Sequence, residues 1–168
     1  MQKILMGLIA TAMLMISGAA FAAESTYYVV RHAEKMEAEG PQSDDPLLTA
    51  KGLRRAAHVS EMLKDEDIIK VYSTLTNRTV MTATVTAAAK GVSLEAFSTD
   101  DLGAFADMLK AQEGTFLIVA HSSSTPDLAS LLSGENIPKL DESDYEQMFK
   151  VVITDGTAVL TKMVTTFE

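Results

Sequence analysis

The sequence predicts an α/β fold of three layers, with helices on both faces of a mostly parallel sheet. Short apolar runs suited to buried strands alternate with helical segments along most of the chain. Near the C-terminus, the segment FKVVITDGTAVLTKMV has two β-rich runs around Asp155-Gly156, which predicts an antiparallel hairpin. A length of 168 residues fits a single domain.

The N-terminal segment has the pattern of an export signal. Lys3 precedes an uncharged apolar run, Ile4–Ala23, that contains the small-residue sequence Ala20-Phe21-Ala22. This sequence fits the A-x-A rule of signal peptidase. We expect residues 1–22 to be a cleaved signal peptide, residues 23–168 to be the mature domain, and the mature protein to be periplasmic. The alternative is an uncleaved anchor, because roughly 20 apolar residues can span a bilayer.

The sequence of the mature chain predicts four strands before the hairpin, and it also predicts four helices. The strands are expected at Thr26–Arg31, Ile68–Ser73, Val92–Phe97 and Thr115–His121. The helices are expected at Thr49–Leu63, at Thr76–Lys90 with Gly91 as its terminator, from Ser98 or Thr99 to about Ala111, and from Thr125 to Gly134. In the first of these helices, the expected buried stripe is Leu53, Ala56, Ala57 and Leu63.

Charged and titratable residues collect at the predicted strand ends. Arg31 and His32 close the first strand, His121 closes the fourth, and Arg78 lies in the first turn of the helix after the second. In sheets of this class, ligands bind beyond the carboxyl ends of the strands. An arginine near a helix N-terminus is favourable when an anion binds there, because backbone N–H groups and the guanidinium match phosphate oxygens. The four residues therefore predict a phosphate pocket.

This pocket also has the groups needed for catalysis. A neutral imidazole is a nucleophile near pH 7, and its attack on phosphorus gives a phosphohistidine that water then hydrolyses. The two arginines would stabilise the charge on the transferring group. The sequence therefore predicts a phosphomonoesterase, with a module that binds phosphate esters without turnover as the alternative.

Other polar residues near the strand ends are weaker candidates. Substrate contacts are possible from Glu34, Lys35, Ser122 and Ser123, and a proton donor is sought in Asp100 and Asp101. Each has an ordinary structural alternative: a solvated charge, a serine turn, or a carboxylate favoured by the helix dipole.

Composition excludes several classes of function. The chain has 14 basic and 23 acidic residues, a formal net charge of −9, which opposes binding to nucleic acid. It has no cysteine, so disulfides, thiolate metal sites and a cysteine nucleophile are impossible. Without tight metal-ligand spacing, we expect no metal and no cofactor.

The expected partner is a small phosphorylated substrate. We expect the mature protein to be a monomer or a weak oligomer, without stable membrane association after cleavage. The acidic loop 36–46 should disfavour highly anionic substrates.

Four segments resemble the histidine phosphatase superfamily, which has the phosphoglycerate mutase-like fold. They are R-H-A-E-K at 31–35, L-T-A-K-G at 48–52, Y-S-T-L-T-N-R-T-V-M-T-A at 72–83 and V-A-H-S-S-S-T-P-D-L at 119–128. The resemblance implies that His32 is the nucleophile and that Arg31, Arg78 and His121 complete the phosphate pocket. The small size is similar to the short phosphatase branch.

The chain departs from the family pattern at several positions. It has Ser123 where the family often has Asn, and Arg55 and Met81 where Gln is common. The acid phosphatase branch has Asp directly after the second histidine, where this chain has Ser122. The resemblance therefore leaves the general acid unassigned.

Overall fold

The structure, a computed structural model, describes residues 24–37 and 44–167. The predicted signal peptide lies outside the described residues. The strands are β1 (Glu24–Arg31), β2 (Ile68–Ser73), β3 (Leu94–Ala96), β4 (Gly114–Ala120), β5 (Gln147–Thr154) and β6 (Thr157–Val164). The helices are α1 (Ala50–Met62), α2 (Asn77–Lys90), α3 (Leu102–Lys110) and α4 (Ser124–Ser133). Within these ranges, none of the helices has the length and apolarity to cross a bilayer.

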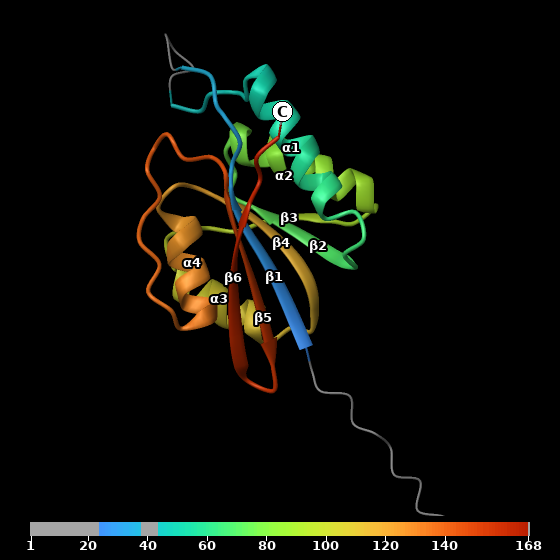
Figure 1. Cartoon of the computed structure of the whole chain (residues 1–168), viewed down its shortest axis with the longest axis vertical. Coiled ribbons are helices and arrows are strands. Elements are labelled where there is room, and N and C mark those ends of the chain that lie inside the picture. Colours follow the sequence, from blue (N-terminus) through green and yellow to red (C-terminus); the bar gives the residue numbers. More distant parts are fainter. Residues whose placement is uncertain (1–23, 38–43, 168) are drawn as a thin grey trace, which may run out of the picture.

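The strands form one mixed sheet in the order β3-β2-β4-β1-β5-β6 (Figure 1). The β1–β4, β2–β4 and β2–β3 pairs are parallel, whereas β5 is antiparallel to β1 and β6 is antiparallel to β5. The mostly parallel sheet and its C-terminal antiparallel hairpin confirm the predicted fold class. The carboxyl ends of β1, β2 and β4 consequently meet at one edge of the sheet.

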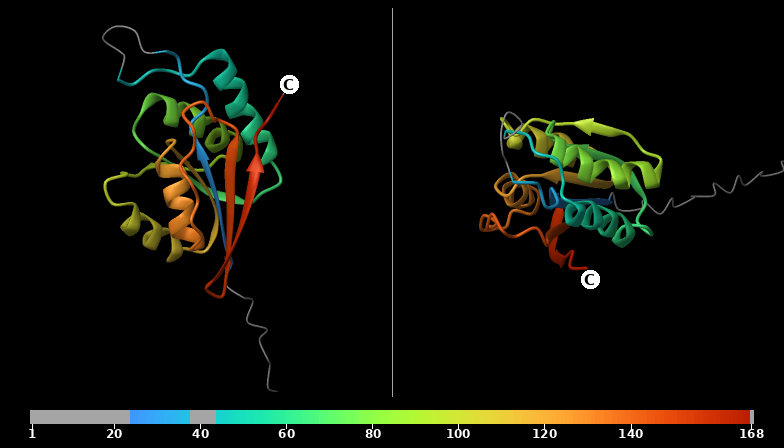
Figure 2. Two further views of the ribbon diagram at one scale, coloured as in Figure 1. Left: turned by 60° about the vertical axis from the view of Figure 1, so that its left-hand side comes forward. Right: turned by 90° about the horizontal axis from the view of Figure 1, so that it is seen from above.

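Helices cover both faces of this sheet (Figure 2). Residues of α1 and α2 pack with Tyr28 and Val30 of β1, whereas residues of α3 and α4 pack with Tyr27 and Val29. This division follows from the period of two in a strand, which points successive side chains to opposite faces. Because the strand is apolar on both faces, it has to lie in the centre of the sheet.

The hairpin turn has the predicted chemistry. Thr154 pairs with Thr157, so the loop between β5 and β6 has two residues. Asp155 and Gly156 both have positive φ, 50° and 78°. A two-residue turn with this geometry matches the twist of the flanking strands, which is why Asp-Gly favours it.

Two local predictions for the helices are wrong. In α1, Leu53 and Ala57 are exposed, and the buried face includes Gly52 and Arg55. The helix is turned this way because its N-terminal turn packs on the loop after β1 rather than on the sheet alone. The second correction concerns α3, which is capped by Asp101 and not by Ser98 or Thr99, because the Asp101 carboxylate accepts the N–H of Ala104 at 2.9 Å.

Gly52 allows a close approach between α1 and the loop after β1. A Cβ atom at this position would overlap the carbonyl oxygen of Glu34. The same carbonyl accepts hydrogen bonds from the Thr49 N–H at 2.9 Å and the Thr49 hydroxyl at 3.2 Å. The Thr49 hydroxyl in turn accepts the Gly52 N–H at 3.0 Å, which caps the helix.

We expect Gly52→Ala to lower the free energy of unfolding by about 1–3 kcal/mol, because backbone atoms have to move to admit the methyl group. Urea unfolding measures the change. Gly103→Ala in α3 is the matched control, since its added Cβ would have an ordinary contact of 3.5 Å with Asp101. Equal stability of the two variants would contradict the close approach.

Candidate active site

The two histidines are brought together by the pairing of β1 with β4. Arg31 pairs with Ala120, and the His32 N–H donates to the Ala120 carbonyl at 2.9 Å. His32 and His121 thus follow neighbouring strands at the same level. Their ring centroids are 5.5 Å apart in an edge-to-face arrangement. The sequence prediction that these residues share one edge of the sheet agrees with this geometry.

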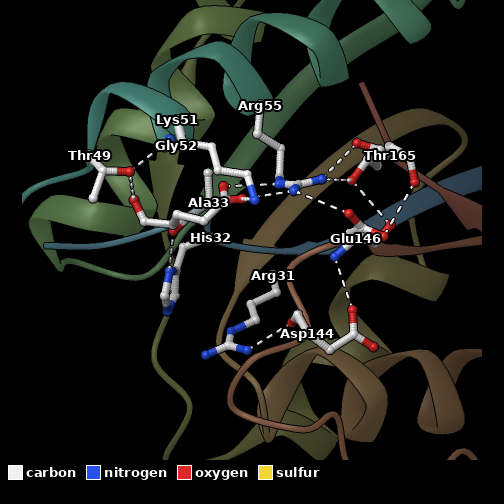
Figure 3. Close-up of polar contacts among 12 residues, drawn as sticks. Arg31, His32, Ala33, Thr49, Lys51, Gly52, Arg55, Asp144, Glu146 and Thr165 are labelled. Atoms are coloured by element: carbon white, nitrogen blue, oxygen red, sulfur yellow. Dashed lines mark hydrogen bonds and ion pairs between the residues drawn. The ribbon is translucent and has the colours of Figure 1, made fainter. Parts of the chain in front are cut away.

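His32 is held as a neutral imidazole. It is 3% exposed, and its Nδ1 lies 2.8 Å from the carbonyl oxygen of Ala33 (Figure 3). A carbonyl can only accept, so Nδ1 carries the proton and Nε2 has the free lone pair. Burial lowers the pKa of His32 to about 3, the Ala33 carbonyl opposes this, and the charges of Arg31 and Arg78 add to it.

His121 is fixed by hydroxyl groups. Its Nε2 lies 2.9 Å from the Thr74 hydroxyl, which also hydrogen-bonds to the Thr79 hydroxyl at 2.9 Å. The His121 N–H donates to the Ser124 hydroxyl at 3.1 Å. Burial lowers the pKa of His121, and the charges of Arg78 and Arg31 lower it further. This imidazole is therefore also biased to the neutral form.

Arg31 is enclosed by the segment between α4 and β5. Its Nη1 donates to the carbonyls of Asp141, Glu142 and Asp144 at 3.0, 3.0 and 2.8 Å. Its Nη2 donates to the Glu142 carboxylate at 2.9 Å, and the Tyr145 ring packs over the guanidinium at 4.1 Å. The side chain is 1% exposed, and in this structure its contacts are with the protein. Arg31 therefore anchors this segment.

Arg78 carries a carboxylate partner at the N-terminus of α2. Its Nη1 lies 3.3 Å from Asp45, whose carboxylate also accepts the Asn77 N–H at 2.7 Å. Asp45 thus lies at the helix N-terminus where the sequence predicts an anion. Arg78 and Arg31 each have a buried Nε–H without a hydrogen-bond partner among the described residues.

The other predicted substrate contacts are arranged differently from one another. The Ser122 hydroxyl donates at 2.6 Å to the carboxylate of Glu142, which also contacts Arg31, whereas Ser123 is exposed before α4. The backbone of Lys35 forms an isolated antiparallel β-bridge with Leu48. The Glu34 carboxylate accepts hydrogen bonds from Arg55.

The two carboxylates considered as proton donors lie at the start of α3. Asp101 caps the helix, and the Asp100 carboxylate accepts the Ser98 hydroxyl at 2.8 Å. Both residues are exposed. The carboxylates whose charge raises the pKa of His121 are Asp45 and Glu142, so these two lie nearer the histidines electrostatically.

Sequence reasoning missed three residues that border the site: Thr74, Glu142 and Tyr145. The position of Thr74, directly after β2, is a signal that the strand-end rule could have used. Glu142 and Tyr145 lie in a segment without regular structure, where no periodicity indicates what they contact. Within residues 24–37 and 44–167, no group of three or more His, Asp or Glu side chains is placed to hold a metal ion.

Comparison with known proteins gives a family and a fold. Residues 27–103 match the sequence model of the histidine phosphatase superfamily (branch 1). None of the curated proteins compared with the chain matches it significantly.

Solved structures share the fold across most of the chain. The protein histidine phosphatase SixA, solved with tungstate, has a TM-score of 0.70 and 18% identity over 83% of this chain and 97% of its own. The phosphoglycerate mutase of Bacillus anthracis str. Sterne has a TM-score of 0.58 and 17% identity over 86% of this chain and 94% of its own. Phosphoserine phosphatase of Entamoeba histolytica, solved with 3-phosphoglyceric acid, has a TM-score of 0.60 and 16% identity over 84% of this chain and 98% of its own.

These proteins are similar to the chain in fold. Because their sequence identity is low, the similarity shows the fold alone. The family match covers β1 to the start of α3, which includes Arg31, His32 and Arg78. Residues 27–103 are therefore similar to the histidine phosphatase superfamily, and the chain has the phosphoglycerate mutase-like fold.

Proposed function

We propose that the chain is an exported phosphomonoesterase that hydrolyses a small phosphorylated substrate through a phosphohistidine at His32, without a metal ion. The observation that carries the proposal is the state of His32: a buried neutral imidazole with an available Nε2, beside His121 and near two arginines. The family and fold support a phosphatase in general.

The chemistry uses this lone pair directly. Nε2 of His32 attacks phosphorus, the bond from phosphorus to the leaving oxygen breaks, and the leaving oxygen takes a proton. Water then attacks the phosphohistidine, releasing inorganic phosphate and the neutral imidazole. The hydrogen bond to Ala33 keeps Nδ1 protonated, so a positive charge on the phosphorylated ring is stabilised where it forms. Arg31 and Arg78 would bind the equatorial oxygens.

Binding of a phosphoryl group requires an exchange of partners at the arginines. Glu142 lies on Arg31 and Asp45 lies on Arg78, so an incoming dianion competes with two carboxylates of the protein. Glu142 is 78% exposed, so it can leave Arg31 at low cost. SixA, which is similar in fold, was solved in complex with tungstate, and this supports oxyanion binding by a protein of this fold.

The alternative is a module of the same fold that binds phosphate esters without turnover. It is favoured by the position of Asp100 and Asp101, which form their hydrogen bonds at the start of α3 and leave the leaving group without an assigned proton donor. Rapid release of inorganic phosphate from any small ester would exclude it. An enzyme without a strong donor should prefer phenolic, acyl or N–P phosphates over alkyl esters.

The proposal also covers the location of the protein and its partners. The apolar run before Glu24 supports export to the periplasm, and the formal charge of −9 supports a small phosphorylated substrate rather than nucleic acid. We further propose that the mature protein is a monomer or weak oligomer without stable membrane association.

His32→Ala should lower turnover of p-nitrophenyl phosphate by a factor on the order of 10³ or more, because it removes the nucleophile. The assay is run in EDTA, and the phosphohistidine is trapped with ³²P-labelled substrate. His58→Ala in α1 is the control for removing an imidazole. Activity that survives in His32→Ala, or that chelator abolishes in the wild type, would refute the mechanism.

Glu142→Gln should tighten inhibition by inorganic phosphate or tungstate by about two- to fivefold, because Arg31 and Ser122 lose a competing carboxylate. The inhibition constant is measured against p-nitrophenyl phosphate. Glu135→Gln, an exposed change of the same charge in the same connecting segment, controls for net charge. Equal inhibition constants in the two variants would mean that Glu142 does not compete with the ligand.

The neutral His32 should also give stability a distinctive pH dependence. The unfolded chain binds a proton at this residue near pH 6.5, whereas the folded chain binds one near pH 3. The free energy of unfolding should therefore fall as pH falls below about 6.5, by about 2 kcal/mol between pH 7 and 5 from this residue alone. Urea unfolding of wild type and His32→Asn across this range measures the difference. Parallel curves would show that the folded protein binds this proton as readily as the unfolded chain, and would contradict the lowered pKa of His32.

A further inference from the structure

Arg55 lies outside the pocket, yet it is bound to the segment that carries the catalytic histidine. Its side chain is 3% exposed on the inner face of α1. Its Nε and Nη2 donate to the two carboxylate oxygens of Glu34 at 2.9 and 2.8 Å. Glu34 follows His32 by two residues. The paired donors match a planar carboxylate, so they fix its orientation as well as its distance.

The loop from His32 to Glu34 is held on its other sides by backbone contacts. The Ala33 N–H donates to the Thr82 hydroxyl of α2 at 3.0 Å. The Glu34 carbonyl accepts both donors of Thr49 at the start of α1. The Glu34 side chain is the remaining point of attachment, and Arg55 is its buried partner. Lys51, which also reaches Glu34 at 3.2 Å, is 60% exposed.

The same guanidinium reaches the C-terminal segment. Its Nη1 donates to the Thr165 carbonyl at 2.7 Å and contacts the Thr165 hydroxyl at 3.2 Å, as Figure 3 shows. The Thr165 N–H donates to the Glu146 carbonyl at 2.7 Å, and the Glu146 carboxylate lies 3.6 Å from Nη2. Glu146 adjoins Asp144 and Tyr145, which contact Arg31. Arg55 thus connects the His32 loop to the segment that encloses Arg31.

We propose that Arg55 is a positioning residue for this site: it fixes the His32 loop through Glu34 and, through Thr165 and Glu146, the segment that encloses Arg31. The expected effect on turnover rests on the proposed function. The expected effect on the position of His32 rests on the contacts alone. The substrate does not need to touch Arg55, because a displacement of His32 by about 1 Å suffices to slow attack on phosphorus.

The test compares Arg55→Gln, which keeps a hydrogen-bonding side chain without the charge, and Arg55→Lys, which keeps the charge without the planar fork. Arg54→Gln is the matched control, since Arg54 is the exposed neighbour on the same helix. Turnover of p-nitrophenyl phosphate is measured beside the ring ¹H–¹⁵N signals of His32. We expect Arg55→Gln to lower kcat by about 10- to 100-fold, to shift the His32 signals, and to change KM less than kcat. Arg55→Lys should recover part of kcat, and Arg54→Gln should match the wild type.

A loss of folded protein would lower kcat but leave the His32 signals of the folded fraction in place, so the two effects are distinguishable. If Arg55→Gln does not fold, Arg55→Lys carries the test by the same two measurements. Wild-type kcat and unchanged His32 signals in the folded variant would overturn the inference. The signals need no turnover, so an inactive wild type would refute the proposed function and leave this test in force.

Discussion

β1 and β4 run side by side in the centre of the sheet, and each is followed by a histidine of the site. Their parallel register sets Arg31 beside Ala120, so His32 and His121 leave the sheet at one level. β2 flanks β4 on its other side, which brings Thr74 to the same edge and places its hydroxyl on His121. The register of these strands therefore sets the geometry of the site.

The cations of this pocket are stabilised locally in a protein of net negative charge. A buried guanidinium is costly unless its donors are satisfied. Arg31 meets this requirement with carbonyl groups on Nη1, whereas Nη2 holds the exposed carboxylate of Glu142. Nη1 therefore fixes the segment before β5. In the proposed function, Nη2 is the nitrogen at which a phosphoryl group would replace the Glu142 carboxylate.

The fold and the four central residues of the site could be predicted because they depend on patterns along the chain. Strand ends follow from apolar runs, and a parallel sheet gathers those ends at one edge. Glu142 and Tyr145 could not be found this way, because their contacts with Arg31 join segments more than a hundred residues apart. For Asp101, the sequence allowed both a proton donor and a structural carboxylate, and the structure shows its local role as the N-cap of α3, which accepts the N–H of Ala104.

The position of Arg55 also bears on the charge state of His32. A carboxylate two residues from an imidazole favours the protonated ring when it is unpaired. Burial would raise the pKa of Glu34, but the hydrogen bonds from Arg55 outweigh it and leave that pKa below its usual value. Glu34 is therefore ionised, yet its charge is matched by a guanidinium at 2.8 Å, and the pair has no net charge to offer the histidine. Burial and the nearby arginines then determine the state of His32, so that Nε2 keeps the lone pair that the proposed attack on phosphorus requires.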